Sequence, residues 1–447
     1  MEDPMPDASN VIVHAFNWNY RDVAAHADEF RQCGYRFVLV SPPSLSNGGA
    51  WWGRYQPRDY RVVRSPLGNK ADFVSMISAV RAQGLGVLVD VVLNHMANEP
   101  SRPEDLTFPG AETLAQYAAD PTFGDDKLFG DLSHNLFSDQ DFNLPFCIFN
   151  WNDAQAVRLG RICGEHDTGL PDLKSNDWVI QQQRNYLFAL KNLGIEGFRV
   201  DAAKHLPTSH LNAVFGNGLA DGMFVFGEVI DSEFRRAPPF IEDYVDQTNH
   251  CAMDFPLHNT LVSAFRPGGS LSALRDPELD GHALPKFRAV TFTVTHDIPN
   301  NSTFRGLIMD RTDEHLAYAY LLGRDGGVPA VYSDHGESDG LFTNNWKDAF
   351  RREDLVAMIR FHNAVQGTTM DWLADDDCYL VFRREHLGLV SINKCDTQAH
   401  IPISTQGLLP DRTYRDVLSG NELTFPNHQH VLVTPARSAQ LWLLQDL

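Results

Sequence analysis

Six charged or titratable side chains stand at or near the ends of short apolar runs, where a folded protein rarely places them without a reason. They are Asp90, Arg199, Asp201, Glu228, His296 and Asp297. Burying carboxyl groups at the ends of apolar strands costs several kcal/mol unless the groups are paired or functional. Catalytic sites are where proteins accept such a cost. Any one of these residues alone is more simply a surface carboxylate or a paired ion, but together they predict an active site.

Two of these carboxyl groups have the surroundings that glycoside hydrolysis requires, in which one carboxylate attacks the sugar and another carboxyl group donates a proton. Arg199 and Asp201 are two residues apart on one predicted strand, so they share a face and the cation should keep Asp201 ionised as the nucleophile. Glu228 follows the apolar segment "FVFG", which should raise its pKa and make it the acid. The two carboxyl groups should then lie roughly 5 to 5.5 Å apart.

Short apolar runs predict the strands that must position these residues. The runs begin at Val11, Tyr35, Gly86, Gly197, Met223, Ala289 and Gly327, and a weaker candidate begins at His250. Strands that are apolar on both faces belong to parallel sheets covered by helices. Eight such strands alternating with helices predict an α/β protein built on a closed (β/α)₈ TIM barrel, in which the chemistry sits at the C-terminal ends of the strands.

Amphipathic segments between these runs predict the covering helices. Residues 70–83 have apolar side chains at helical spacing, with Asn69 as the N-cap and Gly84 as the stop. A second helix should begin after Asn19 and end near Gly34.

The domain limits follow from two breaks in this alternation. Some eighty residues separate the third strand from the next helix, too many for a structureless loop, so residues 96–175 are predicted to form an inserted subdomain B. After about residue 366 short alternating runs predict a C-terminal β-sandwich domain, residues 366–447. The barrel itself should comprise residues 1–95 and 176–365.

The chain carries a formal net charge of −21 over 447 residues. This charge repels a phosphate backbone or an anionic membrane, so we expect a neutral ligand and no nucleic-acid or membrane partner. No apolar run approaches the roughly 18 to 20 residues that cross a bilayer. The first ten residues lack the features of a secretory signal, so the protein is either intracellular or the product of signal removal, with secretion slightly favoured. We expect a monomer.

Four segments of the sequence carry a family resemblance. "DVVLNH" at 90–95, "GFRVDAAKH" at 197–205, "GEVI" at 227–230 and "THD" at 295–297 resemble, in order and spacing, the signature segments of the α-amylase family of glycoside hydrolases (family 13). "SPPSLSNGGAWWGRYQPRDY" resembles a loop of animal-type α-amylases, and "GLPDL" at 169–173 resembles a fifth family segment. The resemblance covers roughly residues 10–335, whereas the C-terminal domain is matched only by its position.

The resemblance implies a retaining cleavage of α-1,4-glucosidic bonds and assigns a role to each motif residue. Asp201 would be the nucleophile, Glu228 the general acid and base, and Asp297 the third acidic residue, which holds sugar hydroxyls. Arg199 would support the nucleophile. The other side chains expected to bind substrate are His95, Lys204, His205 and His296.

The aromatic stretch "WWGRYQPRDY" predicts a sugar-binding platform. A pyranose ring has an apolar face of C–H bonds on which aromatic side chains stack. We therefore expect Trp51, Trp52 and Tyr55 to contact successive glucose units, Trp51 least so, and Gln56 to add a polar contact. The alternative is that one or more of the rings packs beneath the loop.

The resemblance also implies a calcium ion where the inserted subdomain meets the barrel. Asn94 and Asp172 match the family's ligands, and Arg158 and His205 would contribute backbone carbonyl groups. Calcium prefers such oxygen donors, so zinc is a weaker reading. Simple capping of loops is the alternative role for Asn94 and Asp172.

A chloride site of the kind found in animal-type enzymes is not expected. Arg199 is present, but Thr295 and Ala330 stand where an asparagine and a second basic residue would be needed.

Two cysteine pairs are candidates for disulfide bonds. Cys378 and Cys395 are symmetric about a turn at residues 386–387, so a two-residue hairpin would set them opposite each other. Cys147 and Cys163 flank a loop where animal-type relatives carry a bridge. Reduced, buried thiols are an equal alternative.

The sequence thus predicts an α-amylase that hydrolyses internal bonds of starch, glycogen or malto-oligosaccharides. An α-glucan transglycosylase or an exo-acting amylase that forms malto-oligosaccharides is the alternative, because the residues at the cleavage site do not separate these outcomes. A non-catalytic carbohydrate-binding or accessory protein is a remote third reading, since all three acidic residues are present.

Overall fold

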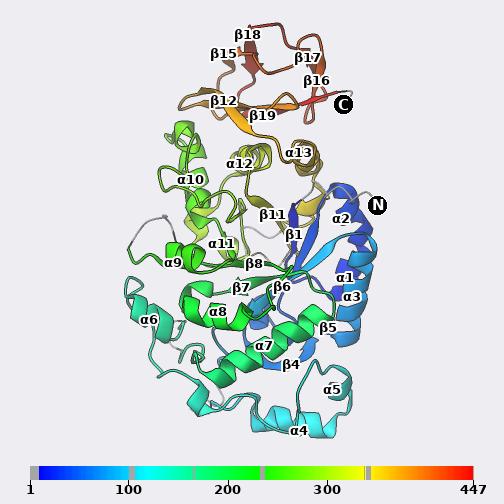
Figure 1. Cartoon of the computed structure of the whole chain (residues 1–447), viewed down its shortest axis with the longest axis vertical. Coiled ribbons are helices and arrows are strands. Elements are labelled where there is room, and N and C mark those ends of the chain that lie inside the picture. The colour runs from blue at the N-terminus through cyan, green and yellow to red at the C-terminus, as the bar shows by residue number, and fades with distance from the viewer. Residues whose placement is uncertain are drawn as a thin grey trace.

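Eight parallel strands close into a barrel in the middle of the molecule (Figure 1). The computed structural model describes residues 10–99, 106–164, 167–231, 237–336, 338 and 344–445, so the amino-terminal segment 1–9 considered above lies outside it. The barrel strands are β1 (Ile12–Ala15), β2 (Phe37–Val40), β6 (Gly86–Val92), β7 (Gly197–Asp201), β8 (Phe224–Gly227), β9 (Cys251–Met253), β10 (Ala289–Thr291) and β11 (Val328–Ser333). They lie around the barrel in chain order. The predicted TIM barrel is confirmed, including its weakest strand, β9.

The barrel strands are apolar on both faces because both faces are buried. All seven residues of β6 are buried. Leu88 points into the barrel, where it packs with residues such as Ile12 and Phe226, whereas Val87 and Val89 belong to the layer between the barrel and the helices. The absence of the usual polar alternation in these strands is thereby explained.

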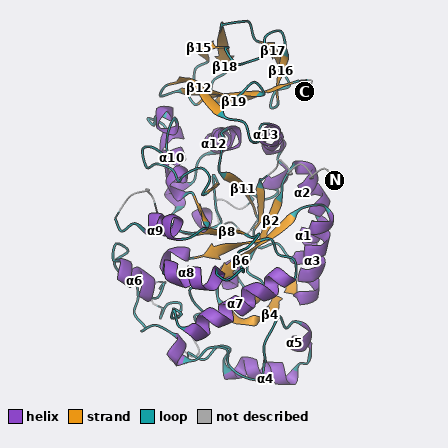
Figure 2. Cartoon of the chain, viewed as in Figure 1, coloured by secondary structure: helices purple, strands orange, loops and turns teal. Residues whose placement is uncertain are grey.

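Helices cover the outside of the barrel (Figure 2). They are α1 (Tyr20–Ala25), α2 (Ala27–Cys33), α3 (Lys70–Ala82), α7 (Asp177–Asn192), α8 (Thr208–Phe215), α9 (Phe240–Gln247), α10 (Phe255–Phe265), α12 (Arg311–Gly323) and α13 (Glu353–Ala364). The short helix α11 (Asp297–Asn300) instead lines a cavity at the barrel mouth. The predicted helix at 70–83 is confirmed, with the Asn69 side chain accepting a hydrogen bond from the Asp72 amide at 3.0 Å. None of the described helices is long and apolar enough to span a bilayer.

The segment predicted as one helix between Asn19 and Gly34 forms two helices, α1 and α2. The break falls at His26, whose backbone leaves the helical region and whose ring nitrogen Nδ1 lies 2.8 Å from the Asp22 carbonyl oxygen. The N-cap Asn19 and the left-handed stop at Gly34 are as predicted. A side chain that bonds its own backbone in this way competes with the regular helix.

Two long connections, which we call the excursions, extend from the barrel after β2 and after β6. A three-stranded sheet follows β2 and consists of β3 (Ser44–Ser46), β4 (Pro57–Ser65) and β5 (Gly68–Asn69), with the 3₁₀ helix η1 (Trp51–Tyr55) between its first two strands. The long connection between β6 and α7 contains α4 (Ala111–Ala119), α5 (Thr122–Asp125), the 3₁₀ helix η2 (Asp139–Asp141) and α6 (Ala154–Leu159). The long insertion after the third barrel strand is therefore structured, as predicted.

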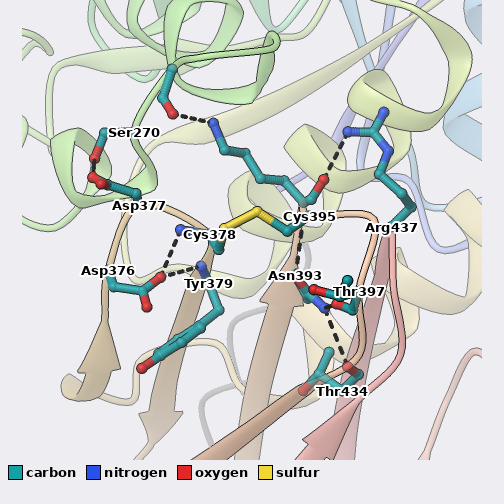
Figure 3. The surroundings of a disulfide bond; sticks show 12 residues. Ser270, Asp376, Asp377, Cys378, Tyr379, Asn393, Cys395, Thr397, Thr434 and Arg437 are labelled. Carbon is teal, nitrogen blue, oxygen red and sulfur yellow. Dashed lines mark hydrogen bonds between the residues drawn. A yellow bond between two sulfur atoms is a disulfide. The ribbon is translucent and has the colours of Figure 1, made fainter.

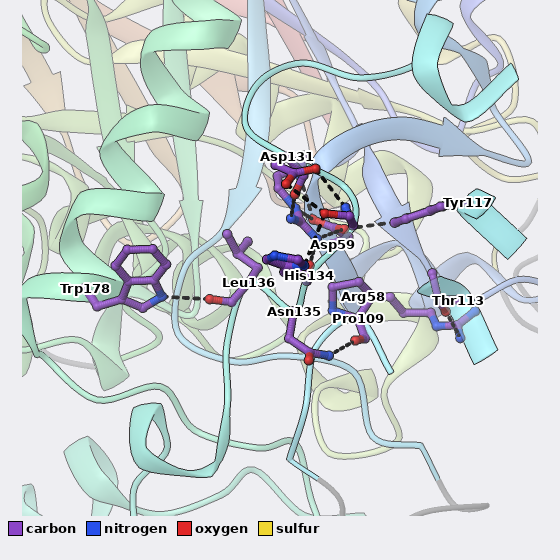
Figure 4. Close-up of polar contacts among 12 residues, drawn as sticks. Arg58, Asp59, Pro109, Thr113, Tyr117, Asp131, His134, Asn135, Leu136 and Trp178 are labelled. Carbon is purple, nitrogen blue, oxygen red and sulfur yellow. Dashed lines mark hydrogen bonds and ion pairs between the residues drawn. The ribbon is translucent and has the colours of Figure 1, made fainter. Parts of the chain in front are cut away.

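A buried ion pair ties the two excursions together (Figure 4). The Asp59 carboxylate on β4 accepts hydrogen bonds from Arg61 at 2.9 and 3.0 Å and from the Tyr117 hydroxyl of α4 at 3.0 Å. Nearby, the indole Nε1 of Trp178 on α7 donates to the Leu136 carbonyl oxygen at 2.7 Å. Since Asp59 and Arg61 are both buried, neither charge can lose its partner without a large penalty.

The C-terminal region is all β, as predicted, and lies beyond α12 and α13 (Figure 1). One sheet has the order β12 (Met370–Asp375), β13 (Tyr379–Arg384), β14 (Gly388–Asn393), β19 (Ser438–Leu444), β16 (Thr413–Asp416), β17 (Glu422–Thr424), and a second sheet pairs β15 (Ala399–Ser404) with β18 (Gln429–Thr434). Phe382 packs with the barrel-side core, whereas Val381 packs with Ile401 of the second sheet. Successive side chains of β13 point to opposite faces of the sheet and thus pack into two different hydrophobic cores.

Both predicted disulfide bonds are present, Cys147–Cys163 and Cys378–Cys395. Figure 3 shows the second bond, between Cys378 and Cys395, and the register of the hairpin that carries it differs from the prediction. Its loop has three residues, and the register places Arg384 opposite Gly388, so Cys378 lies across from Lys394 and bonds its neighbour. Counting residues outward from the turn identifies the two cysteines. It does not determine the register of the two strands, which depends on the length of the turn.

Candidate active site

The Arg199 guanidinium holds three carboxyl groups together inside the mouth of the barrel. Its Nη1 donates to both oxygens of Asp90, at 2.8 and 2.7 Å, and to Oδ1 of Asp201 at 2.8 Å. Its Nη2 donates to Oε1 of Glu228. All four side chains are buried. The barrel register produces this arrangement, because Arg199 on β7 pairs directly with Asp90 on β6.

The turns after β7 and β8 place the two reactive carboxyl groups side by side. Asp201 is the last residue of β7, and Glu228 follows directly after β8. The Glu228 amide donates to the Val200 carbonyl oxygen at 2.9 Å, which continues the ladder one residue past the strand. Ala202 adopts the left-handed conformation, at φ 48°, and its amide lies 3.3 Å from Oε2 of Glu228. A non-glycine residue in this region is typical of functional sites.

The third acidic residue, Asp297, does not sit at a strand end as predicted. β10 stops at Thr291, and Asp297 is the first residue of α11, six residues farther along. His296 precedes it and lies between two rings, with centroid distances of 4.7 Å to Phe16 and 5.0 Å to Tyr55. Its Nε2 is 3.5 Å from Oδ2 of Asp297. The loop nevertheless brings both residues to the barrel mouth.

Burial raises the pKa of every carboxyl group in the cluster, and the Arg199 charge opposes this rise. The pKa of Asp90 rises to about 6. The predicted rise for Glu228 is confirmed. The prediction that Arg199 keeps the pKa of Asp201 low is wrong in the free protein, because burial and the nearby carboxylates Glu228 and Asp90 outweigh the cation. One guanidinium group does not balance four acids, so the cluster binds protons more readily than free carboxyl groups do.

The aromatic loop contributes one wall of the site. Tyr55 is buried, its hydroxyl donates to Oδ2 of Asp90 at 3.0 Å, and its ring stacks on His296. Trp51 is half-buried against Tyr55, whereas Trp52 is 50% exposed. The Gln56 side-chain oxygen accepts hydrogen bonds from Asn47 and from the Asn98 amide, so it ties two loops together.

His95 and Lys204 flank the cluster on different sides. The ring Nε2 of His95 donates to the Tyr55 carbonyl oxygen at 3.0 Å, and burial lowers its pKa to about 4, so the ring is neutral. The Lys204 ammonium group donates to the Ile230 carbonyl oxygen at 2.8 Å and lies 4.9 Å from the centre of the Phe240 ring. Both predicted residues therefore lie at the site.

A cavity of about 250 Å³ adjoins the acid cluster at Asp297. Its walls include Lys204, as predicted, and several residues that the sequence did not single out, namely Trp151, Asn152, Ile230, Phe240, Phe255, Phe304 and Leu307. Trp151 carried the same signal as the loop at 51–60, an aromatic residue among polar neighbours in a long connection. The other apolar wall residues carried no signal that distinguishes them from core residues.

The four predicted calcium ligands form two pairs, and the residues within each pair lie close to each other. Asn94 and Asp172 lie together, with a hydrogen bond between their side chains, and Asp172 also accepts from the Asn143 amide at 2.6 Å. His205 lies beside the segment of Arg158, because its ring Nδ1 donates to the Val157 carbonyl oxygen at 2.8 Å. No group of three or more His, Cys, Asp or Glu side chains suited to a metal occurs in the described part of the chain. Any metal here would depend on amide and carbonyl oxygens.

This geometry suits acid and nucleophile chemistry at a sugar carbon. Asp201 and Glu228 bind neighbouring nitrogens of one guanidinium group, so both can approach the same atom of a substrate. The neutral rings of His95 and His296, whose pKa values fall to about 4 and about 3 through burial, can exchange hydrogen bonds with hydroxyl groups. The aromatic wall offers a face for an apolar ring surface.

Comparisons with known proteins agree with this geometry. The profile of the family "Alpha amylase, catalytic domain" matches residues 38–254. An α-amylase of Aeromonas hydrophila is 49% identical over 444 residues, which cover 97% of this chain and 95% of that protein. An α-amylase-related protein of Drosophila melanogaster is 31% identical and covers 92% of this chain and 86% of its own length.

Solved structures bear on the fold. α-Amylase I of Eisenia fetida, solved as a mutant with maltohexaose, superposes with a TM-score of 0.78 at 22% identity and covers 98% of both chains. An α-amylase of Malbranchea cinnamomea gives a TM-score of 0.74 at 19% identity, over 98% of this chain and 97% of its own.

Replacing Arg199 with Met should make the stability of the protein more dependent on pH. Without the guanidinium group the pKa values of the buried carboxyl groups rise further, so the folded variant holds more protons than its unfolded chain over a wider pH range. Its free energy of unfolding then falls more steeply as pH rises. We expect a loss of about 3 to 5 kcal/mol at pH 8 and a smaller loss at pH 5, measured by urea unfolding.

The control is Arg383→Met, which removes the cation of an ion pair whose Asp371 side chain is 52% exposed. That change should alter stability by at most about 1 kcal/mol. An Arg199→Met variant with the same deficit at both pH values would contradict the role of the cation.

Proposed function

The chain belongs to the α-amylase family of glycoside hydrolases, and we propose that it hydrolyses internal α-1,4-glucosidic bonds of starch, glycogen or malto-oligosaccharides with retention of configuration. It is a glycoside hydrolase by its family. The observation that carries the finer proposal is the single guanidinium group of Arg199, which binds the carboxyl groups of both Asp201 and Glu228. Two carboxyl groups bound to neighbouring nitrogens of one guanidinium group favour the short separation of a retaining enzyme over the wider separation of an inverting one.

Glu228 is the residue that holds the catalytic proton. The charge of Asp297 raises the pKa of Glu228, and the two side chains interact closely enough to share a proton. Asp201 and Glu228 both accept a hydrogen bond from the Arg199 cation. We place the proton on Glu228 for the first displacement and the negative charge on Asp201, which keeps its contact with the Arg199 cation although burial raises its pKa in the free protein.

The reaction then proceeds in two displacements. In the first, Glu228 donates its proton to the glycosidic oxygen while a carboxylate oxygen of Asp201 bonds to the anomeric carbon, and the bond to the leaving sugar breaks. In the second, the ionised Glu228 takes a proton from water, whose oxygen bonds to the anomeric carbon as the ester to Asp201 breaks. Each displacement inverts the carbon, so the product keeps the α configuration.

The surrounding residues orient the sugar. Tyr55, Trp51 and the exposed Trp52 offer successive faces on the non-reducing side. The rings of His95 and His296 hydrogen-bond hydroxyl groups at the cleaved unit. Lys204, with the cavity that it lines, receives the leaving-group side of the chain, and His205 supports that side. Because the Gln56 oxygen is already bonded to the protein, only its amide group is left for substrate.

We also propose that Asn94, Asp172 and the carbonyl groups of Arg158 and His205 hold a calcium ion. The donors are all oxygens, which calcium prefers. Within the described residues Asp172 is a buried carboxylate whose hydrogen-bond partners are the amides of Asn94 and Asn143, and it forms no ion pair there. A bound calcium would add to the positive charge of Arg161, which already acts on Asp172, and would join the barrel to the inserted subdomain. We also propose that residues 96–175 form the inserted subdomain, that residues 366–447 form the C-terminal domain, and that the protein acts as a monomer.

Replacing Glu228 with Gln should lower kcat on soluble starch by about a thousandfold or more, because the amide cannot donate the proton. Binding of maltoheptaose, measured by calorimetry, should persist, since the side chain keeps its shape. The control Glu422→Gln alters an exposed residue of the C-terminal region and should retain full activity. A Glu228→Gln enzyme with normal turnover would exclude the proposed acid.

The calcium proposal is tested by stability. Adding calcium at about a hundred times its dissociation constant should stabilise the EDTA-treated wild type by about 2.7 kcal/mol. Asp172→Asn should lose most of this gain, because the variant lacks the carboxylate. The change Asp371→Asn, at an exposed position, should keep it. The ligand assignment fails if Asp172→Asn responds to calcium as the wild type does in thermal unfolding.

A further inference from the structure

Four large apolar side chains protrude into solvent from one short segment, which we name the 144–151 ridge. They are Leu144, Phe146, Phe149 and Trp151, which are 80%, 41%, 89% and 48% exposed. Ten large hydrophobic side chains are exposed in the described part of the chain, so four of the ten fall within eight residues. A concentration of exposed apolar surface of this kind marks a binding surface rather than chance.

The fold fixes the ridge in this exposed position. The Cys147–Cys163 disulfide joins it to the segment that follows α6, and the side chain of Ile148 is buried beneath it. The Ile148 amide donates to the Arg161 carbonyl oxygen at 3.1 Å, and the Arg161 amide donates to the Phe146 carbonyl oxygen at 2.8 Å. Because these hydrogen bonds hold the backbone at Phe146 and Ile148, the exposed apolar side chains have little conformational freedom to lose on binding.

The ridge is continuous with the cavity beside the acid cluster. Trp151 belongs to both, and Asn152 follows it in the cavity wall. The Trp151 ring lies edge-on to the ring of His205, at a centroid distance of 5.8 Å. Lys204 lines the same cavity. The ridge therefore adjoins the cavity at Trp151, and the exposed Phe149 lies two residues before Trp151 in the chain.

We propose that the 144–151 ridge binds the part of a long α-glucan chain that extends beyond the cavity, with Phe149 as its principal contact. This inference rests on the proposed function and assigns to the ridge a preference for long substrates. The aromatic faces of Phe146 and Phe149 suit the C–H faces of glucose units. A net charge of −21 disfavours an anionic lipid surface as the occupant.

The test compares a long and a short substrate. Phe149→Ala should lower the ratio of kcat/KM on amylose to kcat/KM on a chromogenic maltotrioside by about 3- to 10-fold, the loss expected for one aromatic stacking contact. Phe149→Tyr should restore the ratio, because it restores the ring. The control Phe287→Ala removes a side chain that is 78% exposed and precedes β10, at the end of the barrel opposite the site, and should leave the ratio unchanged.

Three outcomes would overturn the proposal. The ratio for Phe149→Ala equals that of the wild type, or both substrates lose activity equally, or the change alters only self-association or vesicle binding, measured by sedimentation with and without neutral phosphatidylcholine vesicles. Failure of the proposed function looks different, because the wild type itself would then leave both substrates intact. In that case calorimetry of amylose with the wild type and Phe149→Ala still decides whether the ridge binds glucan.

Discussion

The interaction on which the site depends is the set of hydrogen bonds from one buried guanidinium group to three carboxyl groups. Arg199 can bind Asp90, Asp201 and Glu228 only because β6, β7 and β8 are adjacent, parallel and in the observed register. The closed barrel supplies that adjacency, and its apolar filling removes the water that would otherwise screen the charges. The acid cluster therefore depends on the closure of the barrel.

The excursions from the barrel complete what the strands begin. The loop after β2 lays Tyr55 against Asp90 and His296, so an aromatic wall and the acid cluster are fixed by the same contacts. The long connection after β6 brings Trp151 to the wall of the cavity beside Asp297 and carries the 144–151 ridge. A glucan chain bound as we propose would contact both aromatic surfaces and the acids.

Local sequence patterns predicted the elements well, because strands buried on both faces leave continuous apolar runs that few other structures share. They did equally well for the cluster at Arg199, Asp201 and Glu228, because strand ends of a parallel barrel must converge. The failures depend on distant neighbours. The run from Ala289 looked like a longer strand than β10, so Asp297 was placed at a strand end although it begins α11. The pKa of Asp201 depends on burial and on carboxylates from other strands. The apolar cavity wall at Phe255 and Phe304 cannot be told from core in one sequence.

The stereochemistry of the first product tests the central claim most directly, because the separation of Asp201 and Glu228 decides it. Proton NMR of maltoheptaose hydrolysis, recorded within the first minutes and before the sugars interconvert, shows which anomer forms. Two displacements at a closely held pair predict that the α anomer appears first and the β anomer only later, as mutarotation proceeds. An initial excess of the β anomer would contradict the account, since it would require a water molecule between the two carboxyl groups.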